Sequence, residues 1–441
     1  MNAIHCLTAT IETMYKSGYA ICVALAGVSV SSLTGCSTLR TPPASGSPDH
    51  AFIAYWPAPE NSKGLRLAVK DLIDMKGVVT TAGSEFLAKN GPPARRDAKC
   101  LAIARERGVR IVGKTNTTEF AVSVSGINEY FGIPQNPLSR WRRLIPGGSS
   151  SGSAVAVARG MADVAFGTDT AGSIRVPAAC CGIVGLKTTF GLVPLDGVYP
   201  IAPNDLDTIG PMAKNVAGVV QGMDLLQAGF AAQYRRAVAA NPSARKIRIG
   251  RLYLPGTDRE VDRAVDSALA RGGFEVVKLN PEFADKWIQA EKDAATIAKA
   301  NAWLYDQKFR NEVTLRTKAV VALGGLDYKT DYPDALRRKR PWKAELARCF
   351  RNVDFIALPT LQKLPPSIPL FGGTVAFEGR VFGLQNTAAV NLAGVPALAI
   401  PVPVRDWAVP LTSLQLVGPR RSEAALLNAG RLIENARVAG Y

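Results

Sequence analysis

Short apolar runs alternate with longer helical patterns along this 441-residue chain, and this alternation constrains the fold more than any other feature. Leu65, Leu67 and Val69 alternate with other residues, a period-two pattern that predicts a strand ending at Lys70. Alternation of strands and helices is typical of α/β proteins with a largely parallel sheet. The other predicted strands lie at 109–113, 164–166, 247–251 and 274–279. Helices are predicted at 97–107, 217–228 and 260–271, and a long helical stretch follows the strand at 274–279 and ends at about residue 312.

The composition is that of a globular enzyme, with 47% apolar and 20% charged residues. At roughly 150 residues per domain the chain could hold two or three domains, but a single large α/β domain of this length is also common. We find no internal repeat. The formal charge of +17 indicates a basic surface that favours anionic partners or membrane head groups. It does not by itself indicate nucleic-acid binding.

Only two histidines occur in the chain, His5 and His50. A Ser-His-Asp triad, a Cys-His dyad or a histidine-based zinc site would therefore have to be built from His50 alone. The seven cysteines include no C-x-x-C pair, which argues against a metal knuckle or a disulfide framework. We expect no metal ion and no cofactor.

The N-terminal segment has the pattern of an export signal. Residues 17–39 carry no charge, follow Lys16 and include a short apolar core. The tetrapeptide 33–36, Leu-Thr-Gly-Cys, resembles the bacterial lipobox, in which the cysteine is acylated after cleavage. We therefore predict a lipoprotein signal peptide over 1–35, lipidation at Cys36, and a Pro/Ser/Gly-rich tether over 36–50. The predicted location is the cell envelope, facing the periplasm, and a cytoplasmic location is the alternative. The segment could instead be an uncleaved anchor, or an untranslated upstream extension with a chance cysteine, and Met14 is an alternative start.

The residues rule out one common hydrolase site and favour another. A G-x-S-x-G motif centred on Ser150 resembles the nucleophile elbow of α/β-hydrolases, but no histidine follows residue 50. A lysine is the remaining neutral-pH base, provided that burial lowers its pKa from about 10.4 toward 7 or 8. Lys70, at the end of a buried strand, is the best placed lysine for that role.

Three further segments make the chain recognisable. They are rich in glycine, serine and other small residues and resemble the signature of the amidase signature family: 147–154 (GGSSSGSA), 167–179 (GTDTAGSIRVPAA) and 182–187 (GIVGLK). Shorter matches lie at 69–77, 80–84, 113–116, 391–396 and 414–418. The resemblance covers the chain from about residue 60 to its end, although residues 220–350 are only loosely similar. It implies one large α/β domain over 51–441, with a mixed, mostly parallel central sheet covered by helices.

The resemblance also implies a catalytic site. In that family a Ser-cisSer-Lys triad hydrolyses amides through an acyl-enzyme. Ser173 corresponds to the nucleophile, Ser149 to the bridging cis-serine and Lys70 to the base. Asp169 and Arg175 also match, as supporting residues.

Two further groups of residues are assigned by the same resemblance. Backbone N–H groups of four small or short residues correspond to the oxyanion hole, namely Thr170, Ala171 and Gly172, together with Ser173 itself. The loop 120–133 corresponds to a wall of the substrate pocket, with an apolar lining of Ile127, Tyr130 and Phe131.

These assignments predict an amidase that releases ammonia or an amine from a small-molecule amide. The predicted partners are that substrate and the membrane, through the lipid anchor, with no nucleic acid; a homodimer is left open. One alternative is a glutaminase subunit of an amidotransferase, which needs cytosolic partner proteins. Another is a catalytically silent envelope lipoprotein that retains the fold. Aliphatic, aryl and peptide amides and esters remain candidate substrates.

The lipobox leads to a direct prediction about Cys36. Cell fractionation and mass spectrometry should find the mature wild-type protein in the membrane with an acylated N-terminal cysteine. Cys36→Ser should abolish acylation and leave the signal uncleaved. A soluble cytosolic protein that retains residues 1–35 would contradict the prediction.

Overall fold

The computed structural model describes residues 47, 49–59, 63–138, 142–370, 374–406 and 408–438, which belong to one compact unit. The predicted signal peptide, Cys36 and most of the predicted tether lie outside the described residues, so these predictions remain predictions. Within the described part of the chain, no helix is both long enough and apolar enough to cross a membrane.

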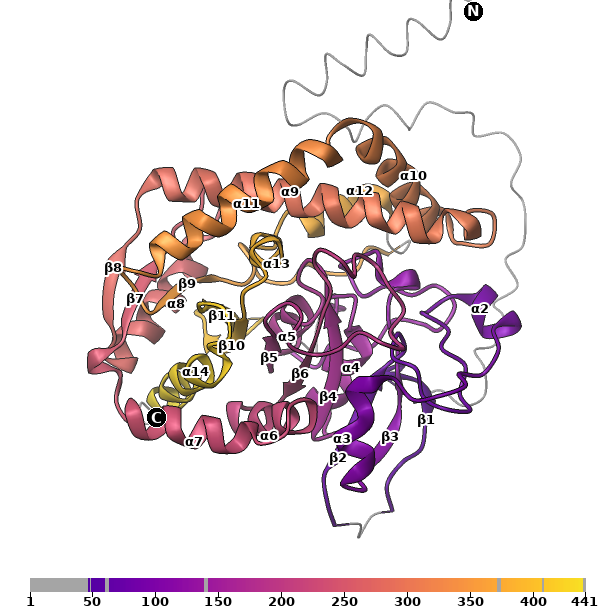
Figure 1. The fold of residues 1–441 in the computed structure, drawn as a ribbon, viewed down its shortest axis with the longest axis horizontal. Helices are drawn as coiled ribbons and strands as arrows, with labels where there is room; N and C mark the ends of the chain where they lie inside the picture. Colours follow the sequence, from indigo (N-terminus) through magenta and orange to yellow (C-terminus); the bar gives the residue numbers. More distant parts are fainter. Residues whose placement is uncertain are drawn as a thin grey trace, which may run out of the picture. The chain divides into compact units, whose positions relative to one another are not determined.

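A single eleven-stranded sheet runs through the whole unit (Figure 1). The order of its strands is β1 (Phe52–Tyr55), β3 (Arg110–Thr115), β2 (Arg66–Lys70), β4 (Val164–Asp169), β6 (Thr208–Ala213), β5 (Val184–Lys187), β10 (Ala397–Pro403), β11 (Leu411–Val417), β9 (Phe355–Pro359), β7 (Arg248–Arg251) and β8 (Glu275–Lys278).

The predicted mixed sheet is confirmed, but the balance of strand directions differs from the prediction. Four of the ten pairings between described neighbouring strands are parallel and six are antiparallel. Parallel neighbours need a long crossover connection, whereas β10 and β11 are joined directly as a hairpin. The parallel pairs lie toward the two ends of the sheet, and the middle, from β4 to β9, is antiparallel.

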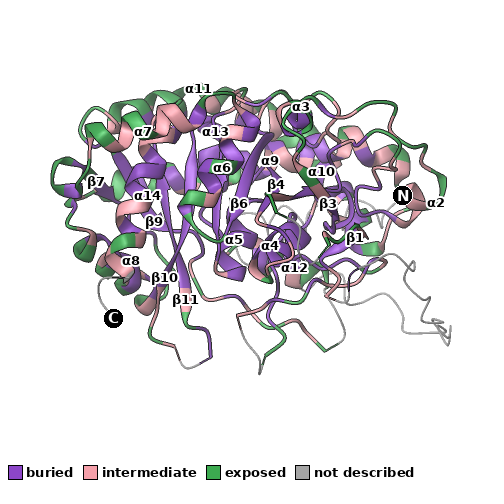
Figure 2. Ribbon diagram, turned by 90° about the horizontal axis from the view of Figure 1, so that it is seen from below, coloured by how far each residue is buried: buried purple, intermediate pink, exposed green. Residues whose placement is uncertain are grey.

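Helices cover both faces of the sheet, and their outer surfaces are exposed, while most strands are buried and the edge strand β8 is largely exposed (Figure 2). The helices are α2 (Glu85–Asn90), α3 (Ala102–Glu106), α4 (Ser151–Ala158), α5 (Arg175–Cys181), α6 (Val216–Leu226), α7 (Phe230–Ala240), α8 (Arg259–Gly272), α9 (Pro281–Asp306), α10 (Leu315–Thr330), α11 (Tyr332–Cys349), α12 (Val375–Phe382), α13 (Ala388–Ala393) and α14 (Glu423–Val438). Short 3-10 turns lie at Lys99–Leu101, Glu119–Ala121, Ala244–Lys246 and Gln307–Phe309.

The two core layers show which helices face which side of the sheet. Leu67 and Val69 of β2 share one hydrophobic cluster with residues of α6, α8 and α14. Ala68 belongs to another cluster, with residues of α4 and α5. Because side chains alternate along a strand, Lys70 points to the same face as Ala68, toward α4.

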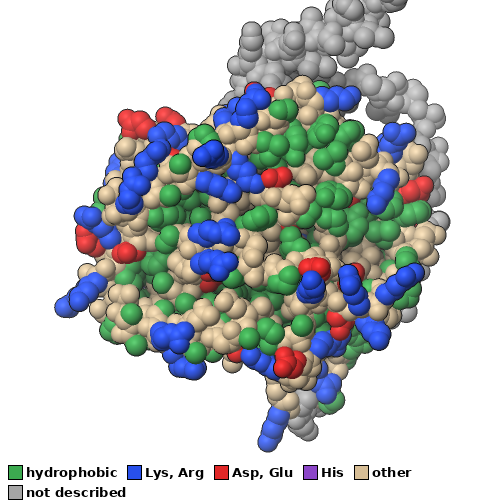
Figure 3. Space-filling view, viewed as in Figure 1, with side chains coloured by type: hydrophobic (Ala, Val, Ile, Leu, Met, Phe, Trp, Pro, Cys, Tyr) green, Lys and Arg blue, Asp and Glu red, His purple; other side chains and the backbone are tan. Residues whose placement is uncertain are grey.

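The surface agrees with the basic composition. Lys and Arg side chains are spread over the face seen in Figure 3, and acidic side chains are fewer there. The arginine- and lysine-rich cluster of 337–343 lies on α11. Arg338 and Lys339 in this cluster form ion pairs with Asp293 and Asp205.

Candidate active site

The carboxyl ends of two neighbouring parallel strands bring the predicted base to the site. β2 and β4 pair in register, with Val69 opposite Phe166. Lys70, the last residue of β2, therefore lies beside the end of β4. Its Nζ donates hydrogen bonds to Ser149 Oγ at 2.7 Å and to Thr168 Oγ1 at 2.8 Å. The side chain of Lys70 is fully buried.

Burial changes the protonation of Lys70. Removal from water disfavours the ammonium form and lowers the pKa of Lys70 to about 7. The negative charges of Asp169 and Asp207 oppose this shift in part. A substantial fraction of the Lys70 side chain is therefore a neutral amine at physiological pH, which is the form that a general base requires.

The two predicted serines lie on loops that meet next to Lys70. Ser149 immediately precedes the turn into α4, and its peptide bond with Gly148 is cis. Ser173 lies between β4 and α5. The Ser150 N–H donates to the Ser173 carbonyl at 3.2 Å, which holds the two loops together. The first turn of α4 also packs closely against the backbone just before β1. A Cβ atom on Gly152 would lie only 2.2 Å from the Ala51 carbonyl oxygen. Glycine is the residue that fits there.

A buried polar network holds the loop that carries Ser173. Asp169 accepts hydrogen bonds from the N–H groups of Gly172 and Ile174, at 2.8 and 3.1 Å. Burial alone would raise the pKa of Asp169, but the adjacent Arg175 guanidinium lowers it to about 2. Asp169 is therefore a permanent carboxylate, paired with Arg175 at 2.9 Å.

Arg175 extends this network to the C-terminal third of the chain. Its guanidinium donates to the Thr387 carbonyl, to Gln415 Oε1 and to Asn391 Oδ1, at 2.9, 2.6 and 2.6 Å. Asn391 in turn donates to Asp169. Both charges of the ion pair are therefore satisfied without water, which is the condition for a buried pair to be tolerated. Asp169 and Arg175 have the supporting positions that the sequence suggests.

The predicted oxyanion loop differs in one respect from the expectation. Gly172, at φ +136°, directs its N–H to Asp169 rather than toward open space. The side chain of Thr170 is fixed by a 2.6 Å hydrogen bond that its Oγ1 donates to Asp207. The assignment of Thr170, Ala171 and Gly172 as oxyanion donors therefore remains a prediction, and Gly172 is its weakest member.

A small pocket opens beside Ser173. It holds about 50 Å³, and apolar side chains dominate its wall. Its lining residues are Ala121, Val122, Val124, Thr170, Ala171, Ser173, Ile201, Ala295, Ala298, Lys299, Ala302, Val320 and Phe382. The loop 120–133 thus contributes to the wall, as the sequence suggests, but through residues 121–124.

The three residues predicted to line the pocket are not among its lining residues. Ile127 and Phe131 are buried in the same loop. The ring of Tyr130 packs edge-on against Phe131, with the ring centroids 4.7 Å apart. Asn128 accepts hydrogen bonds from the N–H groups of Tyr130 and Phe131, so this turn is fixed by its own contacts. Their assignment to substrate binding therefore lacks support from this geometry.

Sequence reasoning missed two polar residues at the site. Thr168 is the second partner of the Lys70 amine, and its position depends on the β2–β4 register. Gln385 is buried, and its side-chain amide has no hydrogen-bond partner within the described residues. A Cβ on Gly172 would lie 3.1 Å from Gln385 Oε1, so this amide lies against the oxyanion loop. An unpaired buried amide costs about 1–3 kcal/mol, which makes Gln385 a candidate contact for substrate.

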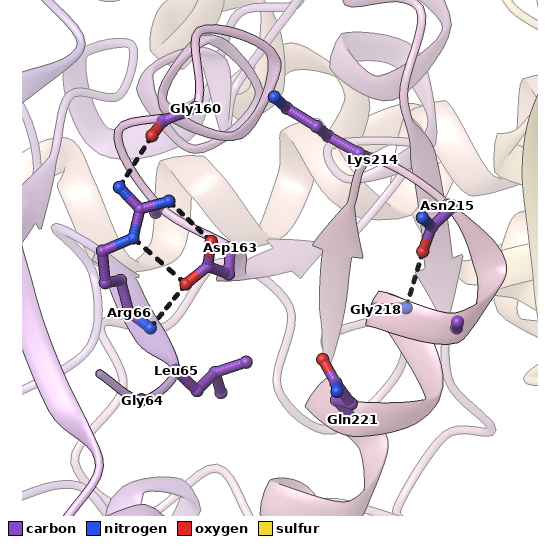
Figure 4. A pocket seen from close by; sticks show the side chains of 11 residues that line it. Gly64, Leu65, Arg66, Gly160, Asp163, Lys214, Asn215, Gly218 and Gln221 are labelled. Atoms are coloured by element: carbon purple, nitrogen blue, oxygen red, sulfur yellow. Dashed lines mark hydrogen bonds and ion pairs between the residues drawn. The ribbon is translucent and has the colours of Figure 1, made fainter. Parts of the chain in front are cut away.

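A larger cavity, of about 500 Å³, lies near the opposite ends of β2 and β4 (Figure 4). Arg66 and Asp163 form a bidentate ion pair on its wall, and Arg66 also donates to the Gly160 carbonyl. These charged groups satisfy one another and none is a nucleophile. Within the described residues, no group of three or more His, Cys, Asp or Glu side chains could hold a metal ion. Lys70, Ser149 and Ser173 stay the predicted catalytic residues.

Comparison with known proteins identifies the family of the chain. The family model described as Amidase matches residues 62–427. A glutamyl-tRNA(Gln) amidotransferase subunit of Halobacterium salinarum is 33% identical, over 84% of this chain and 95% of that protein. 2-Amino-5-chloromuconic acid deaminase of Comamonas testosteroni is 33% identical, over 84% and 81%. The structure of 6-aminohexanoate cyclic dimer hydrolase with substrate superposes with a TM-score of 0.72 and 25% identity, over 86% of each chain.

The pKa of Lys70 predicts the pH dependence of the site. The rate at which a fluorophosphonate labels Ser173 should rise with pH through a midpoint at about 7 and reach a plateau at higher pH, because the base acts only when neutral. Lys70→Arg should label slowly at every pH, since a guanidinium stays protonated.

A second buried lysine supplies the control. Burial also lowers the pKa of Lys187 to about 7, but its Nζ donates to the carbonyls of Thr188 and Val395. Lys187→Met should therefore keep the wild-type midpoint, with folding checked by circular dichroism. A midpoint that disappears in folded Lys187→Met, or a profile in wild type that is flat from pH 6 to 9, would contradict the assignment.

Proposed function

This chain belongs to the amidase family, and on that premise we propose that it hydrolyses carboxylic amides through an acyl-enzyme on Ser173. Ser149 relays the proton and Lys70 is the base. The observation that carries the proposal is the 2.7 Å contact between a fully buried lysine amine and the Ser149 hydroxyl. Burial lowers the pKa of both Lys70 and Lys187 to about 7, but only Lys70 contacts a serine hydroxyl, whereas Lys187 contacts backbone carbonyls.

The first half-reaction forms the acyl-enzyme. The neutral Lys70 amine accepts the proton of Ser149 Oγ, which accepts the proton of Ser173 Oγ as that oxygen attacks the amide carbonyl carbon. The carbonyl oxygen becomes an oxyanion, which the N–H groups of the loop 170–173 stabilise. The relay then runs backward and protonates the leaving nitrogen. The C–N bond breaks, and ammonia or an amine leaves.

The second half-reaction regenerates the enzyme. Water attacks the ester carbonyl of acylated Ser173, and the same relay accepts its proton. Collapse of the tetrahedral intermediate breaks the bond to Ser173 Oγ, which recovers its proton from Ser149. The carboxylic acid leaves as its carboxylate. Throughout this cycle Asp169 and Arg175 keep the loop in place, because their charges are fully paired inside the protein.

The pocket supports a small, neutral acyl group. Lys299 is the one charged side chain among its described lining residues, and an ion pair with Asp327 at 2.6 Å engages this amine. Alanine and valine side chains make up most of the remaining wall. A charged substituent on the acyl chain would lose water there without gaining a partner, at a cost of several kcal/mol.

The glutaminase subunit of an amidotransferase is the second candidate function. It is favoured by the likeness to the glutamyl-tRNA(Gln) amidotransferase subunit of Halobacterium salinarum. Glutamine, however, carries both an ammonium and a carboxylate, and the described pocket wall offers neither an unpaired cation nor a carboxylate. The electrostatics of the pocket therefore favour the hydrolysis of neutral amides.

The triad leads to a set of alanine variants. Ser173→Ala should abolish both turnover and fluorophosphonate labelling, because it removes the acylated atom. Lys70→Ala and Ser149→Ala should each lower kcat by roughly 10³-fold or more. Ser151→Ala is the matched control, since the buried Ser151 hydroxyl has no hydrogen-bond partner within the described residues. If folded Lys70→Ala and Ser149→Ala kept near-wild-type amide hydrolysis, the relay would be wrong.

The two candidate functions are separated by substrate choice. Ammonia release should be measured from propionamide, butyramide and glutamine under identical conditions. We expect kcat/KM for the neutral amides to exceed that for glutamine by about 10²-fold or more, from the cost of burying unpaired charges. A preference for glutamine would instead support the glutaminase function.

A further inference from the structure

Helix α10 is apolar on the side that faces away from the protein. Leu315, Leu323 and Leu326 are 84%, 40% and 47% exposed. With Ala319 and Ala322 they form one stripe at helical spacing, which we call the α10 stripe. Figure 3 shows hydrophobic side chains gathered over this helix.

The opposite side of α10 already has its partner. Thr317, Val321 and Gly324 are buried, and a Cβ on Gly324 would lie 2.0 Å from the Lys299 carbonyl oxygen of α9. The inner side therefore packs directly on α9. This inner side also carries the buried Arg316 and Asp327, whose charges are paired with Glu378 and Lys299. Packing within the described chain therefore explains the inner side of α10 but leaves the apolar residues of the α10 stripe exposed.

The charges around the stripe are mostly positive. Five charged residues are exposed between residues 304 and 329, and four of them are cations: Lys308, Arg310, Lys318 and Lys329, with Glu312 as the one anion. Asp327 of α10 is buried and paired with Lys299. Glu129 and Glu378 form ion pairs with the buried Arg316. Glu119 accepts hydrogen bonds from Thr314 at the start of α10, and Asp331 follows its last residue.

An apolar stripe bordered by cations matches one kind of binding partner. Leucines on one side of a helix and lysines at its margin are the pattern of helices that lie in the interface of an anionic bilayer. A symmetric dimer through the same stripe would instead place the cations of one copy against those of the other. We propose that the α10 stripe docks on a membrane surface that contains anionic lipids, independently of any lipid anchor at Cys36.

Docking would also bring the candidate active site close to the membrane. Val320, on the same helix, lines the pocket beside Ser173. Arg316 fixes α10 to the rest of the site through an ion pair with Glu378 of α12 and a hydrogen bond to the Ile127 carbonyl. Val320 lies three residues before Leu323, so the pocket wall and the proposed docking face are neighbouring sides of one helix.

Vesicle sedimentation tests the proposal without relying on activity. The chain from residue 42 to 441 contains every described strand and helix as one compact unit, so it is used to exclude the N-terminal segment. We expect it to sediment with vesicles of phosphatidylcholine and phosphatidylglycerol in equal parts, and much less with phosphatidylcholine alone. Binding should weaken as salt is raised.

Paired variants locate the contact. The double variant Leu315→Ser, Leu326→Ser should bind anionic vesicles about tenfold or more weakly, because it removes apolar contact with the bilayer. Val276→Ser, at a 45% exposed valine of β8, is the control and should bind like wild type. Circular dichroism and thermal melting should show that each variant is folded.

A second pair of variants tests the charges. Lys318→Glu with Lys329→Glu should lower binding to anionic vesicles, whereas Arg245→Glu with Lys246→Glu changes the net charge equally in the turn before β7 and should not. Equal binding by stripe variants and wild type, or no binding of wild type to anionic vesicles, would overturn the proposal. So would a wild-type dimer in light scattering that the leucine variant dissociates, since the stripe would then join two copies.

Discussion

A lysine amine held entirely out of water is the constraint on which the rest of the site depends. Lowering the pKa of Lys70 from 10.5 to about 7 corresponds to roughly 5 kcal/mol of bias against the ammonium. The fold provides that bias by ending β2 between β3 and β4, under α4. Asp169 and Asp207 limit the shift, so the amine stays basic enough to accept a proton.

The same region also contains two buried side chains that stay charged, in contrast to Lys70. Asp169 and Arg175 remain ionised because each side chain has several hydrogen-bond partners from distant parts of the chain. A charged, fully paired network thus holds the Ser173 loop in place, and a buried amine lies close to it, where we propose that it acts as the base. Neutral groups of Ser149 and Thr168 contact that amine, so no ion pair holds it in the charged form.

Much of this arrangement follows from local sequence patterns. The alternation at 65–69 predicts the strand that buries Lys70, and the small residues at 147–153 and 167–173 mark the loops of both serines. Non-local features could not be predicted in this way. Thr168 meets Lys70 only through strand register, and Gln385 lies against Gly172 across more than two hundred residues of chain. The antiparallel middle of the sheet likewise depends on which strands become neighbours.

The protonation state of Lys70 can be measured directly by NMR. Protein labelled with ¹³C at the lysine ε carbon should show a resonance that titrates near pH 7 and is lost in Lys70→Met, whereas the pKa of a lysine in a model peptide is about 10.4. The Lys187 resonance, which should also titrate near 7, is assigned with Lys187→Met. A Lys70 resonance that titrates above pH 9.5 in the folded protein would contradict the account, because the amine would then be protonated when the site has to act.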